Sequence, residues 1–267
     1  MKKFFVVFFL AVLCLALISS NGCEKRKESA KNENQILMVC SGAGLMKPMN
    51  ELIKQFEQKT GAKVQVHYGG SGEVFGILQT TCSCDVFIPG AYKYTQDALK
   101  EGYIIKNTIK NLTLHIPVVV VPGNNPKHIQ TLKDLAKPGV KLVLGDPKAT
   151  AIGKVAKKIL KNSGLWQKVK GNILTFTPTV NQLLIYIATG QVDAAIVWED
   201  MTSWAQAKGK IKMVPISKQN IIKTIPTAIT ACAKRHGVFN LAQSFNSFIA
   251  TPQSLAIWEK WGFKPCR

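Results

Sequence analysis

Two short turns rich in glycine and serine contain the residues of this chain that are best suited to binding a ligand. Residues 40–44 read CSGAG and residues 69–72 read GGSG. Each turn follows a short apolar run and precedes a segment with helical spacing. A small-residue turn between a strand and a helix exposes backbone N–H groups at the positive end of the helix dipole. Two such turns in neighbouring β–α units can close on one small anion, so the pattern predicts anion binding.

The same turns also permit a rival interpretation, an exported enzyme that uses Ser71 or Cys40. A serine hydrolase elbow has the pattern Gly-x-Ser-x-Gly, and here Glu73 replaces the last glycine. Cys40 has no histidine identifiable as its base, and the sequence contains no phosphate-binding loop of the Gly-x4-Gly-Lys-Ser/Thr type. We therefore expect a binding protein rather than an enzyme, without a cofactor.

Strands and helices alternate along the chain, and this pattern predicts an α/β fold with mainly parallel sheets. Helical spacing covers 46–59, 95–102, 153–162, 180–189, 240–249 and 252–261, and a further helix begins at 74–78. Strands are expected at 36–39, 64–68, 85–88, 114–121, 141–144, 194–198, 213–216 and 227–232. Parallel sheets bind ligands beyond the carboxyl ends of their strands. The turns at 41–44, 69–72, 145–153 and 198–199 all lie at such ends.

The N-terminus predicts export. Lys2 and Lys3 precede an apolar core that is too short to span a membrane, so residues 1–22 are expected to be a signal peptide. Cys23 directly follows a glycine, which resembles a bacterial lipoprotein cleavage site, although Ser20 departs from the leucine of that pattern. Ordinary cleavage near Gly22 is the alternative. Residues 23–35 are polar and read as a tether, so we expect a periplasmic or cell-surface protein with a lipid anchor on Cys23.

The net charge and the cysteine pattern indicate which partners and which covalent bonds to expect. The formal net charge is +20, but the lysines are dispersed and the chain is exported, so nucleic acid is not an expected partner. An exported chain permits disulfides, and we expect a Cys232–Cys266 bond that ties the C-terminal tail to a strand end. The pairing of Cys40, Cys82 and Cys84 stays open. No directly coordinated metal is expected, because the cysteines lack the spacing of zinc sites.

Several motifs in order resemble the ModA-type molybdate-binding proteins of ABC importers, which are periplasmic type II solute-binding proteins. The marks are GAGL at 42–45, YGGS at 68–71, CDVFI at 84–88, LGDP at 144–147 and DAAIVW at 193–198. A final WGF at 261–263 extends the similarity over nearly all of residues 36–267.

The resemblance implies a two-lobe fold with two crossing strands at the hinge. Lobe one would comprise 36–116 and 228–267, and lobe two 117–227. The implied function is the capture of a tetrahedral oxyanion, molybdate or tungstate first, for delivery to a membrane permease. Sulfate, thiosulfate and phosphonate are alternative anions, and ferric iron is another because Tyr92 and Tyr94 are close in sequence. We expect a monomer.

The resemblance also implies a set of ligand-binding residues. Ser71 matches a ligand serine of the family, and Val180 matches a residue that donates its backbone N–H. Ile152 occupies another such backbone position. The roles of Glu73 and Glu199 stay open between capping a helix and contacting a ligand.

Two positions depart from the family pattern. Gly44 falls where the family has its other ligand serine, and Ser41 is the expected replacement for that hydroxyl. Trp198 falls on the ligand tyrosine of the family, and its indole N–H is the remaining donor there. These departures keep the ligand class and leave the identity of the oxyanion open.

Overall fold

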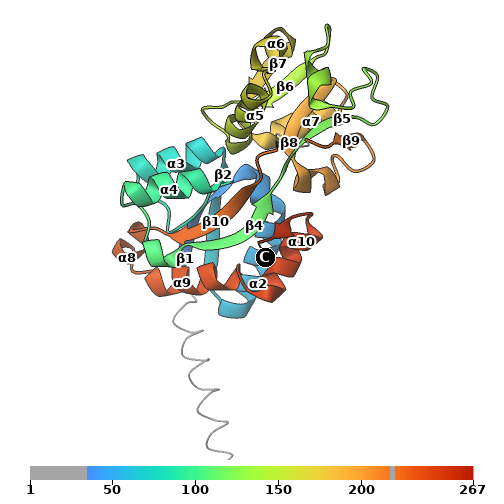
Figure 1. The fold of residues 1–267 in the computed structure, drawn as a ribbon. Helices are drawn as coiled ribbons and strands as arrows, with labels where there is room; N and C mark the ends of the chain where they lie inside the picture. Colours follow the sequence, from blue (N-terminus) through green and yellow to red (C-terminus); the bar gives the residue numbers. More distant parts are fainter. Residues whose placement is uncertain (1–34, 217–219, 267) are drawn as a thin grey trace, which may run out of the picture.

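The computed structural model describes residues 35–216 and 220–266. The expected signal peptide and the lipidated Cys23 lie outside the described residues. Figure 1 shows two lobes, one above the other, joined by strands that pass between them. We call the part built on the six-stranded sheet lobe one and the part built on the five-stranded sheet lobe two.

The sheet of lobe one has the strand order β11-β4-β10-β3-β1-β2. Its strands are β1 (Ile36–Gly42), β2 (Lys63–Gly69), β3 (Val86–Ile88), β4 (Lys110–His115), β10 (Lys223–Ile229) and β11 (Lys264–Pro265). β1 runs parallel to β2 and β3, whereas β10 runs antiparallel to β3 and β4. The parallel part places the ends of β1 and β2 side by side, with Gly42 paired to Gly69.

The sheet of lobe two has the strand order β7-β6-β8-β5-β9. Its strands are β5 (Pro117–Pro122), β6 (Leu142–Gly145), β7 (Ile173–Thr177), β8 (Ala194–Trp198) and β9 (Ile211–Val214). β6 is parallel to β7 and β8, and β5 is antiparallel to β8 and β9. The α/β class is confirmed, but both sheets are more mixed than the sequence predicts, because the strands next to the hinge run against their neighbours.

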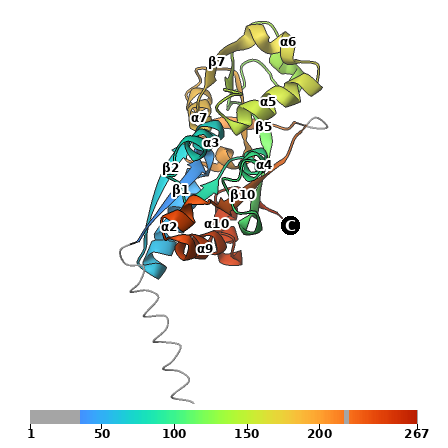
Figure 2. The same cartoon turned by 90° about the vertical axis from the view of Figure 1, so that its left-hand side faces the viewer.

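Nine α-helices surround these sheets in the described part of the chain. They are α2 (Met46–Thr60), α3 (Ser71–Thr80), α4 (Tyr92–Lys100), α5 (Ala151–Asn162), α6 (Trp166–Val169), α7 (Val180–Ala188), α8 (Cys232–Arg235), α9 (Phe239–Phe248) and α10 (Pro252–Lys260). One apolar cluster lies between the lobe-one sheet and α2, α9 and α10. A second joins α3 and α4 on the other face of that sheet to the interior of lobe two. Figure 2 shows α5 and α7 of lobe two above α3 of lobe one.

The predicted strand 114–121 is two strands that belong to different sheets. β4 ends at His115, β5 begins at Pro117, and Ile116 lies between them. Proline favours an extended residue before it and cannot donate a backbone hydrogen bond. The chain therefore stays extended while its partners change from lobe one to lobe two. The carbonyl of Ile116 accepts a hydrogen bond from the backbone N–H of Glu199 (2.8 Å), which ties β8 to this passage.

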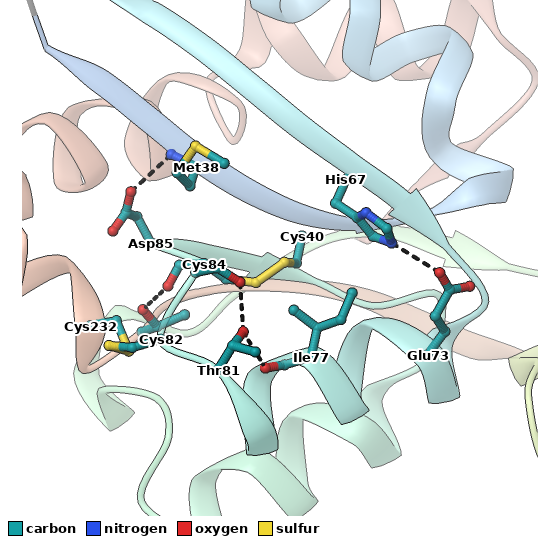
Figure 3. The surroundings of a disulfide bond; sticks show 12 residues. Met38, Cys40, His67, Glu73, Ile77, Thr81, Cys82, Cys84, Asp85 and Cys232 are labelled. Carbon is teal, nitrogen blue, oxygen red and sulfur yellow. Dashed lines mark hydrogen bonds and ion pairs between the residues drawn. A yellow bond between two sulfur atoms is a disulfide. The ribbon is translucent and has the colours of Figure 1, made fainter.

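The expected Cys232–Cys266 disulfide is wrong. The bonded pairs are Cys40–Cys84 and Cys82–Cys232, with Cα–Cα separations of 5.7 and 5.6 Å, and Cys266 is a free thiol. Figure 3 shows both bonds around the loop between α3 and β3.

The sheet order explains this error. Cys232 does not end a strand but begins α8, and the pairing of β10 with β3 brings it to that loop. Cys266 follows β11 beside β4, where its backbone N–H donates to Leu112 (3.4 Å).

No helix among the described residues is long and apolar enough to cross a membrane.

Candidate anion-binding site

A small cavity lies where the two lobes meet, and its volume is about 20 Å³. Both lobes contribute to its wall: residues 42–45, 69–71, Gly90 and His115 from lobe one, and residues 150–152, Val180 and Trp198 from lobe two. A cavity needs about 10–15 Å³ of space for the centre of a water-sized sphere to hold one water molecule. The space therefore suits a small, compact solute rather than an extended organic molecule.

Three helices begin at this cavity. Ser71 is the first residue of α3, Ala151 of α5 and Val180 of α7. The first N–H groups of a helix have no partner within the helix. Among the described residues, no hydrogen bond engages the backbone nitrogens of Ser71, Ala151, Ile152 or Val180. The free N–H groups at the start of α3 in lobe one thus face those at the starts of α5 and α7 in lobe two. Each group lies at the positive end of a helix dipole.

Ser71 adds a side-chain donor to the backbone groups. Its Oγ accepts a hydrogen bond from the backbone N–H of Gly90 (3.0 Å). This bond orients the hydroxyl and leaves its proton available for a solute in the cavity. The N–H of Gly90 occupies one lone pair of Ser71 Oγ, and the hydroxyl proton remains free to donate to the solute.

The wall carries almost no formal charge. None of the described residues that line the cavity is Lys, Arg, Asp or Glu, and His115 is the titratable one. An anion held here is therefore balanced by oriented N–H and O–H dipoles rather than by a counter-cation. Among the described residues, no group of three or more His, Cys, Asp or Glu is placed to hold a metal ion.

Most of the residues expected from the sequence meet at this cavity. Gly44, Ser71, Ile152, Val180 and Trp198 all line it. A Cβ atom on Gly44 would lie 3.2 Å from Val180 and 3.8 Å from the Cδ1 edge of Trp198. The large indole therefore occupies the space beside a residue without a side chain.

Ser41 is the exception. It is buried in β1, does not line the cavity, and its Oγ has no hydrogen-bond partner in the described part of the chain. Side chains alternate along a strand, so Ser41 shares a face with Val39, which packs in the cluster formed with α2. The structure does not bring the expected replacement hydroxyl to the site.

The two glutamates near the cavity have structural partners. Glu73 accepts a hydrogen bond from the backbone N–H of Gly70 (3.2 Å) and pairs with His67 (2.9 Å). It thereby caps the start of α3. Glu199 pairs with Lys264 of β11 (2.9 Å), across the two lobes. Neither glutamate lines the cavity.

The lobes are closed on one another in this structure. The backbone N–H of Gly72 donates to the carbonyl of Ala149 (2.8 Å). A Cβ atom on Gly72 would lie 2.5 Å from the carbonyl oxygen of Lys148. The ammonium of Lys154 lies 4.4 Å from the ring centroid of Tyr94, a cation–π contact between α5 and α4. Burial of Lys154 lowers the pKa of its ammonium.

His115 and Gly90 are cavity residues that the sequence did not single out. His115 Nδ1 lies 2.8 Å from the carbonyl oxygen of Gly90, and its ring stacks on Trp198 with centroids 3.7 Å apart. A lone histidine with no metal-like spacing gives little signal in a sequence. Its place at the carboxyl end of β4, just before the chain leaves lobe one, was the available clue.

Comparison with known proteins now adds the family. The model for bacterial extracellular solute-binding proteins matches residues 37–264. A protein of Haemophilus influenzae, named as a binding protein, is 32% identical over 231 residues, which are 86% of this chain and 91% of the relative. A Bacillus subtilis protein, YvgL, is named as an ABC transporter substrate-binding lipoprotein and is 26% identical over 267 residues, 98% of this chain and 99% of its own.

Further relatives share less sequence. The molybdate-binding protein ModA of Rhodobacter capsulatus is 23% identical over 232 residues, 85% of this chain and 87% of its own. Among solved structures, the sulfate-binding protein SubI of Mycobacterium tuberculosis matches with a TM-score of 0.75 and 19% identity, covering 87% of each chain. This structural likeness confirms the two-lobe fold expected from the sequence.

Proposed function

The chain belongs to the family of bacterial extracellular solute-binding proteins, and on this premise we propose that it captures a compact tetrahedral oxyanion between its lobes. Molybdate and tungstate are the first candidate ligands. The protein would deliver the bound anion to the permease of an ABC importer. One observation carries the proposal. In the part of the chain that the structure describes, the unpaired first N–H groups of α3, α5 and α7 converge on one cavity, and its wall contains no Asp, Glu, Lys or Arg.

The polarity of the cavity supports a fully deprotonated anion. The backbone N–H groups and the Ser71 hydroxyl all act as donors, and the Ser71 oxygen already accepts from Gly90. A solute that carries a proton would need an acceptor, and leaving a buried donor unpaired costs about 1–3 kcal/mol. Molybdate, tungstate and sulfate carry no proton near neutral pH, whereas hydrogen phosphate does. The site therefore favours the first group.

Sulfate and thiosulfate remain alternative ligands within the same proposal, because each is a compact, unprotonated anion with several acceptor atoms. Phosphonate has less support, because it carries a proton near neutral pH as hydrogen phosphate does. Ferric iron has less support, since Tyr92 and Tyr94 do not line the cavity and Tyr94 packs against Lys154. The enzyme alternative that used Cys40 is wrong for the disulfide-bonded protein, because the sulfur of Cys40 is bonded to Cys84.

Membrane anchoring through Cys23 is part of the proposal. The sequence supports it with the Gly22–Cys23 junction after an apolar segment, and the Bacillus subtilis relative is named as a lipoprotein. Such an anchor would hold a monomer beside its permease, with residues 23–35 as the tether.

A thermal-shift panel tests the proposed function. Purified protein is heated with molybdate, tungstate, sulfate, thiosulfate, chromate or phosphate, with chloride as the control. A ligand present at a hundred times its Kd stabilises the folded state by about 2.7 kcal/mol, so at least one dianion should raise the melting temperature while chloride and phosphate do not. A panel in which no oxyanion raises the melting temperature would contradict the proposal.

Substitution of Ser71 by alanine should weaken oxyanion binding about tenfold or somewhat more. A hydrogen bond to a charged group contributes about 1.5–3 kcal/mol, and 1.4 kcal/mol corresponds to a factor of ten in Kd. The variant should also lose about 1 kcal/mol of stability, because the N–H of Gly90 loses its partner. Calorimetric titration measures the first effect. Ser41→Ala is the matched control and should bind as the wild type does, because Ser41 lies outside the cavity.

A further inference from the structure

A buried histidine–aspartate pair spans the two lobes at the wall of the cavity. His115 ends β4 in lobe one, and Asp200 follows β8 in lobe two. His115 Nε2 lies 3.4 Å from Asp200 Oδ1, and the two residues are 1% and 3% exposed. In the described part of the chain, neither the other carboxylate oxygen of Asp200 nor Nε2 of His115 has an aligned hydrogen-bond partner, so the two side chains meet at ion-pair distance.

The contact of His115 with Gly90 limits where the protons of the pair can lie. The carbonyl of Gly90 can only accept, so the Nδ1 atom of His115 that faces it at 2.8 Å must carry a proton. A further proton can be carried by Nε2 or by the nearby carboxyl group, 3.4 Å away. With it on either atom, as imidazolium and carboxylate or as imidazole and carboxylic acid, the pair is neutral. If it is lost, a buried carboxylate is left with a net charge of −1.

We propose that His115 and Asp200 form the charge-selecting element of the oxyanion site, in which one shared proton keeps the cavity wall neutral toward a dianion. This inference rests on the proposed function. It adds a pH dependence of oxyanion affinity and assigns that dependence to His115 and Asp200. Loss of the shared proton places a negative charge behind a cavity meant for an anion, so affinity for a dianion falls as the pH rises. By linkage, binding of the dianion favours retention or uptake of that proton.

The surroundings of the pair support this assignment. Trp198 stacks on one side of the His115 ring, and Phe263 lies 5.9 Å from it. The nearby charged groups, Glu199 and Lys264, are paired with each other. Burial raises the pKa of Asp200, while the contact with His115 lowers it and the charge of Glu199 raises it. Burial thus favours a proton on the pair over an isolated carboxylate.

Titration of three proteins with sodium molybdate and sodium sulfate tests the inference. Wild type, Asp200→Asn and His236→Gln are titrated by calorimetry at several pH values between about 6 and 9.5, at constant high salt. Both anions are dianions throughout this range. His236 is the matched control, because it forms another histidine–aspartate pair, with Asp85 (2.7 Å), that does not line the cavity.

We expect the wild type and His236→Gln to lose affinity by about tenfold or more toward high pH. Asp200→Asn keeps a side chain of the same shape but has no shared proton to lose, so its profile should be flatter. Deprotonation of surface lysines affects all three proteins alike and cancels in the comparison. Parallel profiles for the wild type and Asp200→Asn would overturn the inference and leave the proposed function intact. Absence of saturable binding in all three proteins would overturn both.

A measurement on the wild type alone covers the case in which Asp200→Asn does not fold. Binding heats are compared in two buffers of different ionisation enthalpy at each pH. Net proton uptake that grows toward high pH supports the shared proton, and zero uptake over the whole range contradicts it.

Discussion

Replacement of Gly72 by alanine should reduce oxyanion affinity about a hundredfold without unfolding the protein. A Cβ atom at this position would lie 2.5 Å from the carbonyl oxygen of Lys148 and 3.0 Å from that of Ala149. Both atoms belong to the backbone of lobe two and cannot rotate away. Overpacking of this kind costs about 1–3 kcal/mol, and the Gly72–Ala149 hydrogen bond is lost with it. The cost falls on the closed state, because only closure brings the two lobes together.

Gly76→Ala provides the matched control in the same helix. A Cβ atom there meets nothing within 4 Å, and alanine is favoured over glycine inside a helix by about 1 kcal/mol. This control should bind normally and melt at or above the temperature of the wild type. Titration and small-angle scattering of both variants with molybdate separate the effects, since Gly72→Ala should stay expanded. Normal affinity in Gly72→Ala would mean that binding does not require this closure.

The second large effect is expected from Val180→Pro, which deletes one backbone donor at the cavity. Val180 is the first residue of α7, a position where proline is favoured because its missing N–H is not used by the helix. The preceding Thr179 has φ −135° and ψ 154°, which suits a residue before proline. The helix should therefore form, while a hydrogen bond to a charged ligand worth about 1.5–3 kcal/mol is removed. Affinity should fall between about tenfold and a hundredfold.

Val180→Ala separates the backbone from the side chain. It removes the methyl groups that face Gly44 but keeps the N–H, so its affinity should stay much closer to that of the wild type. Calorimetry with molybdate and unliganded melting curves compare the two variants. Equal affinities in Val180→Pro and Val180→Ala would show that the main chain of α7 does not hold the ligand.

Local patterns in the sequence predicted the elements that build the site. The apolar spacing of α2 matches the residues that it buries, among them Met49, Leu52 and Phe56, and Gly61 ends it with φ 74°. The turns before α3 and α5 were expected at the carboxyl ends of predicted strands. The edge strand β7 was missed, because Leu174 and Phe176 are exposed and its alternation does not mark a buried face.

Contacts between residues far apart in the chain could not be predicted from the sequence. The correct disulfides depend on β10 lying beside β3, which brings Cys232 to Cys82 across 150 residues. No spacing rule contains that pairing. The contact of His115 with Asp200 likewise depends on how β4 and β8 meet at the hinge. By contrast, Ser71 and Trp198 lie in motifs that occur in a fixed order, and Val180 was assigned through the family resemblance.

The most direct test of the central claim is a calorimetric titration of the wild-type protein with molybdate, tungstate and sulfate. The account predicts saturable binding of at least one of these dianions with one ligand per chain, which the deletion of the Val180 N–H weakens. No saturable heat with any of the three, or binding that Val180→Pro leaves unchanged, would contradict the account.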